Sequence, residues 1–329
     1  MKLASFQVQT PVGRFVRIGS VQGERLIDLS SAYVTLLAQQ GEPQPYRLME
    51  ALVPPDMRRL IEGGERALEA ARAAEAFAGE ALARGQLPAG PQGEQLVFAL
   101  NEVRLLPPLP RPNSLRDCLV FEKHMRRGYD ALGLEPPRAW YEMPVYYKGN
   151  PCTLLGHDED LVWPAYTERL DYELELACII GKEGRDIPPE EADRYIFGFA
   201  CLNDFSARDI QMREMQCRLG PAKGKDFGTA LGPWIVTRDE IGDYQNLRMV
   251  ARVNGEVWSE GNSRDMYHSW ANIIAHLSMG ETLYPSDVVG SGTVGLGCGL
   301  ELDRWLKPGD VVEIEIEKIG VLRNRVVKP

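Results

Sequence analysis

The sequence predicts an α+β fold in which strands predominate. From residue 145 onward, short apolar or alternating segments follow one another, separated by turn residues and by only short helical stretches. Residues 2–30 show the same pattern on a smaller scale, whereas residues 51–84 are rich in Ala, Glu, Arg and Leu, as helices are. Strands separated by so little helix favour a mixed or antiparallel sheet over a doubly wound parallel one.

The order of these elements predicts two domains. Turns at residues 11–13 and 22–24 divide the first strands, and helices with an alanine-rich face that packs locally are predicted over residues 51–84. The proline-rich segment 106–112, LPPLPRP, favours an extended connector, because proline lacks a backbone donor and restricts the residue before it. We therefore predict a small N-terminal β and helical domain over residues 1–105 and a larger, strand-rich domain over residues 106–329.

Composition and charge limit the class of protein. The chain has 329 residues, of which 44% are hydrophobic and 26% charged, and its formal net charge is −10. This acidic balance argues against a binding surface for nucleic acid or anionic membranes, which would need clustered Lys and Arg. No signal-peptide pattern opens the sequence and no apolar run reaches about 18 residues, so we expect a cytoplasmic location.

Residues 170–176, LDYELEL, alternate between apolar and acidic side chains. A strand would place Asp171, Glu173 and Glu175 on one face, with neighbouring carboxylates about 7 Å apart. Such charges on a half-buried strand repel one another unless water, a base or a cation neutralises them. A bound metal ion is one such cation. Residues 313–317 alternate in the same way, and spacing alone does not separate the two runs; we interpret the later one as a solvated face.

A second strand is predicted over residues 195–203, and it ends at a turn that carries Asp204. The segment from Ser206 to Asp209 has the form of a helix N-cap followed by an acid three residues later. Asp204 is therefore expected at a junction between a strand and a helix, where its side chain is free to take part in a site.

Three basic or amide side chains are expected near this junction. Arg208 and Gln211 are three residues apart on the predicted helix, so they share a face that points back to the turn. The glycine-rich loop 220–229, GPAKGKDFGT, could deliver Lys225 to the same place. Carboxylates and cations from separate segments thus converge on one region of the predicted fold.

Asp117 and His124 are predicted at the amphipathic start of a helix that follows residues 113–114. By themselves they are more typical of an acid that complements the helix dipole and of a surface histidine. GxSxG and HExxH motifs are absent from the sequence, so serine-hydrolase and zinc-protease interpretations lack support. Residues 290–295, GSGTVG, have the GxGxxG spacing, but a nucleotide fold is not expected, because the strands are separated by too little helix for a doubly wound sheet. The six cysteines are scattered without a CxxC pair, which favours reduced, mostly buried thiols over zinc or disulfides. Surface or packed positions are expected for the other histidines, His157, His268 and His276.

The motifs NDFSARDIQ, LGPAKGKDFGT and LDYELE together resemble the fumarylacetoacetate hydrolase family. The resemblance extends from about Pro112 to the C-terminus, where GSGTVG and GLELDRWLKPGD are similar to the closing strands of that family. It implies that residues 106–329 are a catalytic domain with the family's β-roll fold, and it implies a homodimeric assembly. It also implies that Asp117 is a metal ligand and that His124 is a general base, because both fall on the family's DFYxxxxH spacing.

The resemblance implies three sets of site residues. The metal-binding set is Asp117, Glu173, Glu175, Asp204, Lys225 and Thr229. The catalytic set is His124, Glu301, Lys225 and Arg208, with Glu301 orienting the histidine. The substrate-binding set is Tyr147, Arg208, Gln211 and Thr293. Because carboxylate oxygens without Cys or His suit a hard cation, we expect Mg²⁺, or else Ca²⁺ or Mn²⁺, and zinc would be unexpected.

These residues predict a hydrolase that cleaves a carbon–carbon bond in a small anionic 1,3-diketo acid of the acylpyruvate or fumarylacetoacetate type. Leu119 and Met215 stand where the hydrolases of tyrosine breakdown carry tyrosine, so a short acylpyruvate is expected to be preferred. The family also contains enzymes that decarboxylate, tautomerise or isomerise 2-oxo acids, and 2-keto-3-deoxy sugar acid dehydratases; these are the alternatives. A metal-stabilised β-rich binding module without turnover is the alternative from another class, and metal-dependent consumption of a diketo acid would exclude it.

Overall fold

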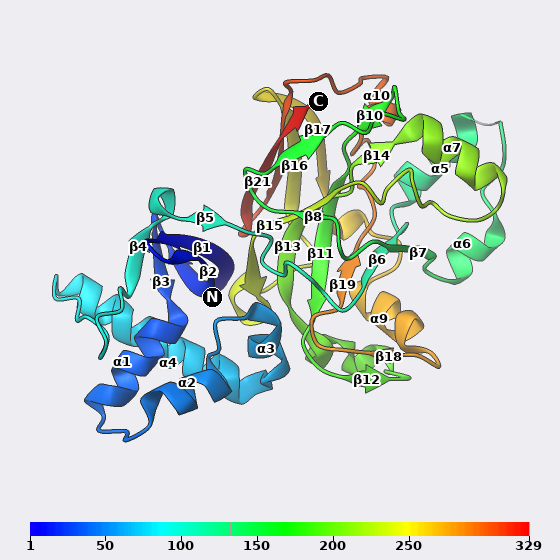
Figure 1. The fold of residues 1–329 in the computed structure, drawn as a ribbon. Helices are drawn as coiled ribbons and strands as arrows, with labels where there is room; N and C mark the ends of the chain where they lie inside the picture. The colour runs from blue at the N-terminus through cyan, green and yellow to red at the C-terminus, as the bar shows by residue number, and fades with distance from the viewer. Residues whose placement is uncertain (132, 329) are drawn as a thin grey trace.

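The computed structural model describes residues 1–131 and 133–328 (Figure 1). The chain opens with an antiparallel meander of β1 (Lys2–Thr10), β2 (Gly13–Gln22) and β3 (Arg25–Asp28). The helices that follow are α1 (Leu29–Gln39), α2 (Pro45–Leu52), α3 (Met57–Glu62) and α4 (Gly64–Ala83). Asp28 caps α1, since its side chain accepts a hydrogen bond from the backbone N–H of Ser31 at 2.9 Å. The alanine face predicted for this region is buried along α4 and consists of Ala67, Ala70, Ala71, Ala74, Ala78 and Ala81.

A long mixed sheet runs through the molecule and connects the N-terminal strands with the rest of the chain (Figure 1). In spatial order, β1 to β3 are flanked by β4 (Val97–Ala99) on one side and by β15 (Thr229–Thr237) on the other. The order continues with β13 (Ile196–Asn203), β11 (Leu174–Ile180), β19 (Val288–Gly290), β6 (Leu115–Cys118) and β7 (Tyr146–Gly149). Off this path, β5 (Arg104–Leu105) pairs with β1, and β8 (Leu154–Leu155) pairs with β15.

A second, five-stranded sheet packs against the middle of the long one. Its order is β17 (Glu256–Asn262), β16 (Arg248–Val253), β20 (Val311–Ile316), β21 (Gly320–Val327) and β9 (Asp160–Val162). Phe199 from the long sheet and Met249 and Ile314 from the second sheet belong to one fully buried core. Burial of each of these side chains contributes about 1.5–3 kcal/mol, so this core holds the two sheets together.

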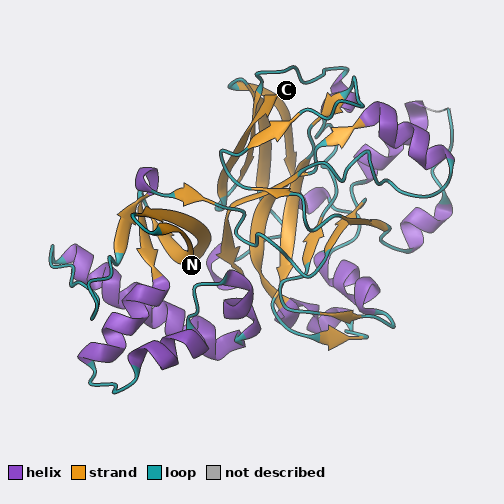
Figure 2. Cartoon of the chain, in the orientation of Figure 1, coloured by secondary structure: helices purple, strands orange, loops and turns teal. Residues whose placement is uncertain are grey.

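The remaining elements are short and lie around the sheets (Figure 2). Two small ribbons pair β10 (Leu170–Asp171) with β14 (Ser206–Ala207), and β12 (Gly184–Arg185) with β18 (Thr282–Leu283). The later α-helices are α5 (Glu122–Ala131), α6 (Arg138–Glu142), α7 (Arg208–Gln216), α8 (Arg238–Ile241), α9 (Trp270–Ser278) and α10 (Gly299–Leu302). The 3₁₀ turns are η1 (Leu100–Glu102), η2 (Pro189–Tyr195) and η3 (Ser263–Asp265). The α+β class with predominant strands is confirmed.

The N-terminal strands and the later strands share hydrogen bonds and a core. β1 pairs with β15 in the register Leu3↔Ile235, and both residues belong to a buried cluster that also contains Ala177 of β11. The connector 106–114 contains no helix or strand, as its prolines predicted. The division of the chain into domains at residue 105 stays a prediction.

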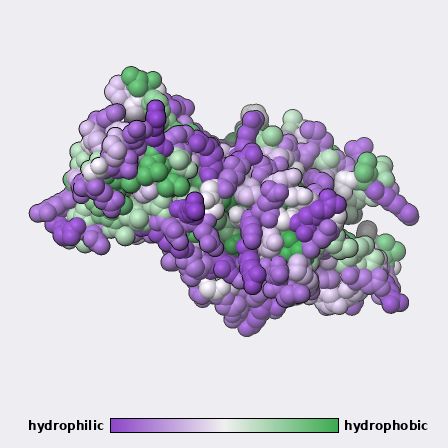
Figure 3. All heavy atoms as spheres, turned by 90° about the horizontal axis from the view of Figure 1, so that it is seen from below, coloured by the Kyte–Doolittle hydropathy of each residue, from purple (hydrophilic) through white to green (hydrophobic). Residues whose placement is uncertain are grey.

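Polar side chains cover most of the face seen in Figure 3. Apolar ones gather mainly at the left, where β1 to β4 and α1 to α4 lie (Figure 1). Among the helices that the structure describes, α4 with 20 residues is the longest, and neither it nor any other is apolar enough to span a bilayer.

Candidate active site

Four acidic side chains from separate parts of the chain meet in the interior. Asp117 is on β6, Glu175 is on β11, Glu173 lies just before β11, and Asp204 follows β13. Each residue is at most 5% exposed, and one oxygen from each lies within 4.8 Å of the others. Gly290 on the intervening strand β19 makes this approach possible, because a Cβ there would overlap Asp117 Oδ1 and lie 3.0 Å from Glu175 Oε2. We call these four residues the carboxylate cluster.

The strand predicted over residues 170–176 is interrupted inside this cluster. β10 ends at residue 171 and β11 begins at residue 174, and Glu173 between them forms an isolated bridge with Cys298. The backbone N–H of Glu173 donates to Asn203 Oδ1 at 2.9 Å. Every residue from 170 to 180 is buried, so the prediction of a half-buried strand was also wrong: both faces are covered.

Two helix starts were also predicted wrongly. Asp117 lies in a strand, because β6 pairs with β19 on one side and β7 on the other, and the helix that carries His124 begins afterwards. Ser206 lies in β14 and its hydroxyl donates to the backbone oxygen of Asp204 at 3.0 Å, so it does not cap α7. Asp209 instead accepts hydrogen bonds from the loop before β10.

Two buried cations hold part of the carboxylate cluster in its ionised form. Lys225 Nζ lies 2.6 Å from Asp204 Oδ2 and also pairs with Glu173 Oε2. Arg208 Nη2 donates to Glu173 Oε1 at 2.8 Å. Burial raises the pKa of Glu173, but the charges of Lys225 and Arg208 outweigh burial and hold this pKa well below its usual range. An ammonium ion has no lone pair, so Lys225 acts in this cluster as a counter-charge.

Asp117 and Glu175 are in the opposite situation. Neither forms an ion pair with another described residue, and Glu175 Oε2 is buried without a hydrogen-bond partner. Burial and then the charge of Asp204 raise the pKa of Asp117 well above its usual range. Burial and then the charge of Asp117 do the same to the pKa of Glu175. A group of oxygen donors with an unsatisfied buried carboxylate fits a hard divalent cation, which would displace the protons on these two residues.

The other predicted residues surround the cluster. Thr229 Oγ1 and Tyr147 Oη donate to the two oxygens of Asp204 at 3.1 and 2.7 Å. Thr293 Oγ1 donates to Glu175 Oε1 at 3.2 Å. Gln211 Oε1 accepts from Arg208 Nη1 at 3.0 Å, as the shared helix face predicted. In this structure Tyr147 and Thr293 therefore position carboxylates, and their contact with a substrate stays a proposal.

A histidine and a glutamate form a second polar pair beside the cluster. His124 Nδ1 lies 2.9 Å from Glu301 Oε2, which also accepts a hydrogen bond from the backbone N–H of Gly297 at 3.1 Å. Burial raises the pKa of Glu301, but the hydrogen bond and charge of His124 outweigh it, so the net pKa lies below its usual range. An ionised Glu301 favours the tautomer with the proton on Nδ1, which leaves Nε2 of His124 free to accept a proton.

Asp171 is a site residue that the sequence did not reveal, although it belongs to the predicted acidic ladder. Its Oδ1 accepts from the backbone N–H of Gly299 at 2.7 Å, and its Oδ2 accepts from that of Leu300 at 3.0 Å and from Arg208 Nε at 2.8 Å. It therefore fixes both Arg208 and the start of α10, which carries Glu301. The alternation predicted that Asp171 lies on the same side of the strand as Glu173. It did not reveal the partners Arg208 and Gly299, which are more than 35 residues away in the sequence.

Replacement of Asp171 by asparagine should lower the free energy of unfolding by about 3–5 kcal/mol, because it leaves the buried guanidinium of Arg208 short of one charge partner. Urea unfolding of the two proteins measures this difference. Asp303 is exposed at the end of α10, so the matched Asp303→Asn variant should change stability by less than about 0.5 kcal/mol. Equal stabilities of the two variants would contradict the structural role of Asp171.

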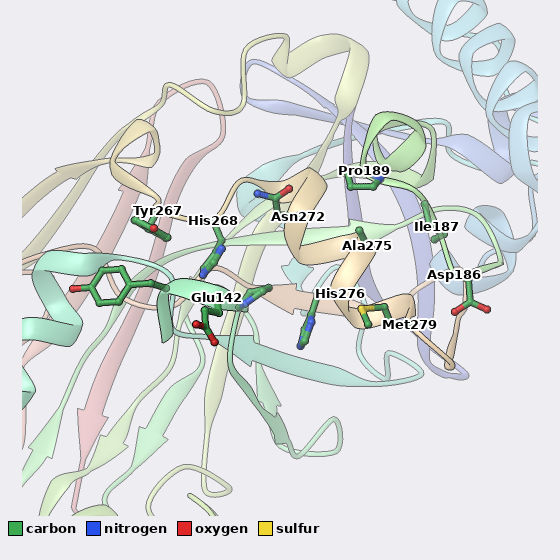
Figure 4. Close-up of a pocket in the computed structure, with 12 residues that line it drawn as sticks. Glu142, Asp186, Ile187, Pro189, Tyr267, His268, Asn272, Ala275, His276 and Met279 are labelled. Atoms are coloured by element: carbon green, nitrogen blue, oxygen red, sulfur yellow. The ribbon is translucent and has the colours of Figure 1, made fainter. Parts of the chain in front are cut away.

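A cavity of about 730 Å³ lies apart from the predicted site, between α6, α9 and the segment before η2 (Figure 4). Two of the histidines without a predicted role line it. His268 is buried and its Nε2 lies 2.9 Å from the backbone oxygen of Trp140, and His276 packs edge-on against Tyr146. Both are packed side chains, as predicted, and no residue of the predicted site lines this cavity.

The β-rich fold and the carboxylate cluster place this protein in the class of enzymes that bind a divalent metal through acidic side chains. Residues 115–327 match the family described as fumarylacetoacetate (FAA) hydrolase C-terminal. Since this match covers most of the chain, the protein belongs to the fumarylacetoacetate hydrolase family, and the predicted resemblance is confirmed.

Two curated relatives are named after the same reaction. The chain is 31% identical to the human mitochondrial oxaloacetate tautomerase FAHD2A over 329 residues, which cover 99% of this chain and 92% of the relative. It is 35% identical to the oxaloacetate tautomerase YisK of Bacillus subtilis over 233 residues, or 70% of this chain and 75% of the relative. Since the human relative is mitochondrial by name, the cytoplasmic location of this chain stays a prediction.

A solved structure extends the comparison to a different reaction. The maleylpyruvate hydrolase from Sphingobium sp. SYK-6, in complex with manganese(II) and pyruvate, is 28% identical and superimposes with a TM-score of 0.68. The alignment covers 100% of this chain and 99% of that one. This solved structure supports the family's fold and, through its bound manganese, a divalent metal. Mg²⁺ as the particular ion and the homodimer stay predictions.

Proposed function

We propose that this protein is a divalent-metal-dependent enzyme that moves a proton at the carbon next to the keto group of a short 2-oxo dicarboxylic acid, with oxaloacetate as the first candidate. The observation that carries the proposal is the His124 to Glu301 pair, with 2.9 Å between Nδ1 and Oε2, beside the carboxylate cluster. The backbone bridge between Glu173 and Cys298 connects the two parts through Cys298, whose Sγ donates to Glu301 Oε2 at 3.4 Å. The human relative, which aligns over 99% of this chain and is named an oxaloacetate tautomerase, supports this choice of reaction.

The carboxylate cluster, with the hydroxyl of Thr229, would hold the cation, for which Mg²⁺ is the expected ion and Mn²⁺ or Ca²⁺ are alternatives. Bound there, the cation would polarise the 2-oxo group of the substrate and so make the neighbouring C–H more acidic. Lys225 pairs with both Glu173 and Asp204, and with Arg208 it outweighs burial and holds the pKa of Glu173 below its usual range, so that Glu173 is ready to bind a cation without first losing a proton.

The proton is carried by His124. Its Nε2 takes the proton from the carbon and returns it to the enolate oxygen, or the reverse, while Glu301 holds the Nδ1 proton and stabilises the imidazolium. Three donors of Arg208 are already used in hydrogen bonds to Asp171, Glu173 and Gln211. We therefore assign Arg208 mainly to positioning the amide of Gln211. That amide is the group that we assign to a substrate carboxylate.

Hydrolysis of a carbon–carbon bond in an acylpyruvate-type acid is the second candidate. It is favoured by the same His124 to Glu301 pair, because a base of this kind can deprotonate water as well as carbon. The maleylpyruvate hydrolase neighbour supports it too. Both candidates need the same cation and stabilisation of a 2-oxo acid enolate; they differ in whether water is added.

Two assays with Mg²⁺ present decide between the candidates. A tautomerase should accelerate the conversion of enol to keto oxaloacetate, followed by ultraviolet absorbance, above the rate in Mg²⁺ buffer alone. A hydrolase should place label from ¹⁸O-water in a new carboxylate when it is given acylpyruvates or maleylpyruvate. Label without accelerated tautomerisation would replace the first candidate by the second, and neither signal with any of these acids would reject both.

A further inference from the structure

Cys298 gives the His124 to Glu301 pair a third ligand-type atom. Cys298 Sγ lies 3.4 Å from Glu301 Oε2, which in turn lies 2.9 Å from His124 Nδ1. The three residues offer one sulfur, one nitrogen and one oxygen that all lie within 4.8 Å of one another. None of these atoms belongs to the carboxylate cluster, so this group is a separate candidate site.

Two elements present these atoms from opposite sides. Cys298 is the residue before α10 and Glu301 is three residues later, so their side chains share the first turn of this helix. His124 faces them from α5. Because the three ligand atoms come from parts of the chain more than 170 residues apart, only the folded protein assembles them.

Burial and hydrogen bonding leave this group incomplete. The side chain of Glu301 is 3% exposed, and its Oε1 is buried without a hydrogen-bond partner. Cys298 is fully buried, whereas the side chain of His124 is 15% exposed. A buried carboxylate oxygen without a donor is unfavourable by about 1–3 kcal/mol or more, and a cation bound to this carboxylate would reduce that cost.

The chemistry of the three atoms selects a different ion from that of the carboxylate cluster. A thiolate, an imidazole and a carboxylate suit a borderline cation such as Zn²⁺, whereas Mg²⁺ prefers oxygen alone. Ligand atoms of a tetrahedral zinc ion are about 3.4–3.6 Å apart given its usual bond lengths. The observed separations of 2.9 and 3.4 Å from Glu301 Oε2 therefore need to open by only about half an ångström or less.

We propose that His124, Cys298 and Glu301 form a second metal site, which binds Zn²⁺ or a similar borderline cation through Nδ1, Sγ and a carboxylate oxygen, with a fourth position open to water. Binding replaces the S–H proton of Cys298, which is released to solvent as H⁺. It also displaces the Nδ1 proton of neutral His124, and the imidazole then carries its proton on Nε2. No oxidation or reduction is involved.

This site would switch off the enzyme. With Nδ1 bound to the cation and Nε2 protonated, His124 has no lone pair left to accept a proton from a substrate or from water. Zinc would therefore inhibit while Mg²⁺ remains bound to the carboxylate cluster. Inhibition rests on the function proposed above, whereas binding of the cation does not, so the two are tested separately.

Cobalt(II) tests binding, because a cobalt–thiolate bond gives a charge-transfer band in the near ultraviolet and oxygen ligands do not. Cys152 and Cys217 are the exposed free thiols among the described residues, so the parent protein carries Cys152→Ser and Cys217→Ser. With saturating Mg²⁺, this parent should show the band at one equivalent of Co²⁺, and addition of Cys298→Ser should abolish it. Absence of the band in the parent, or its persistence without Cys298, would overturn the proposal.

His124→Ala provides a second variant in case Cys298→Ser disturbs the core. His124 is partly exposed, so its truncation should leave a folded protein, as checked by circular dichroism. The affinity for Co²⁺ should be at least about tenfold weaker, since loss of even an outer-shell partner costs that much. An unchanged Co²⁺ titration in this variant would also overturn the site.

Activity assays test the inhibition. Zn²⁺ at a few equivalents, with Mg²⁺ saturating, should lower the rate of the parent more than tenfold, and the rate of the Cys298→Ser variant should change less than twofold relative to its own zinc-free value. Equal inhibition of both, relieved by more Mg²⁺, would place zinc in the carboxylate cluster and reject the switch. If no substrate is turned over, the proposed function fails while the cobalt titration still decides the site.

Discussion

Replacement of His124 by alanine should lower kcat by a factor of about 10² to 10⁴, the usual contribution of a general base. The affinity for Mg²⁺ should stay the same, because His124 contacts Glu301 and is not part of the carboxylate cluster. Steady-state kinetics gives the first quantity, and calorimetric titration with Mg²⁺ gives the second. A variant that lost both together would indicate a collapsed site instead of a missing base.

Two further variants control this result. Glu301→Gln keeps a hydrogen-bond acceptor for Nδ1 but loses the charge that stabilises the imidazolium, so its kcat should fall less than that of His124→Ala. His276→Ala removes a histidine from the separate cavity and should leave kcat within about twofold of the parent, as is usual for changes away from the chemistry. A near-normal kcat in His124→Ala would leave a decarboxylase, in which stabilisation of an enolate suffices, as the remaining candidate.

Replacement of Glu175 by glutamine should abolish most of the metal affinity and turnover while leaving the metal-free protein as stable as the parent. Burial and the charge of Asp117 raise the pKa of Glu175 well above its usual range, which favours its neutral form in the absence of a cation, and glutamine is nearly isosteric with neutral glutamic acid. We expect at least a tenfold loss of Mg²⁺ affinity, as for other groups that support a metal. Isothermal titration and urea unfolding with EDTA measure the two quantities.

Glu173→Gln is the matched control, because it belongs to the same cluster but is held ionised by Lys225 and Arg208. Loss of its charge deprives each of two buried cations of one of its two charge partners, so the metal-free protein should lose about 3–5 kcal/mol of unfolding free energy. Two variants with the same stability would refute the difference in protonation that we assign. Full turnover of the parent after removal of metal by a chelator would refute the metal site itself.

Prediction from sequence succeeded where side-chain periodicity reports burial directly. The alanine face of residues 64–83 and the later strands follow from such patterns, because a helix or strand must bury one kind of side chain. It failed at the start of the site, where Asp117 was expected in a helix and Ser206 at an N-cap. Both residues are fixed by strand pairing with segments distant in sequence, and local preferences are weak enough to be overridden by such contacts.

The sequence by itself determined the class of fold, the family and the types of residue that the chemistry needs, because these follow from periodicity and from motifs that are continuous along the chain. Only the tertiary structure decided which of the acids has a lowered pKa and which has a raised one. Glu173 and Glu175 are two residues apart and indistinguishable in the pattern, yet one faces Lys225 and Arg208 while the other faces Asp117. Electrostatic energies depend on distance and burial, and neither quantity is fixed until distant segments pack together.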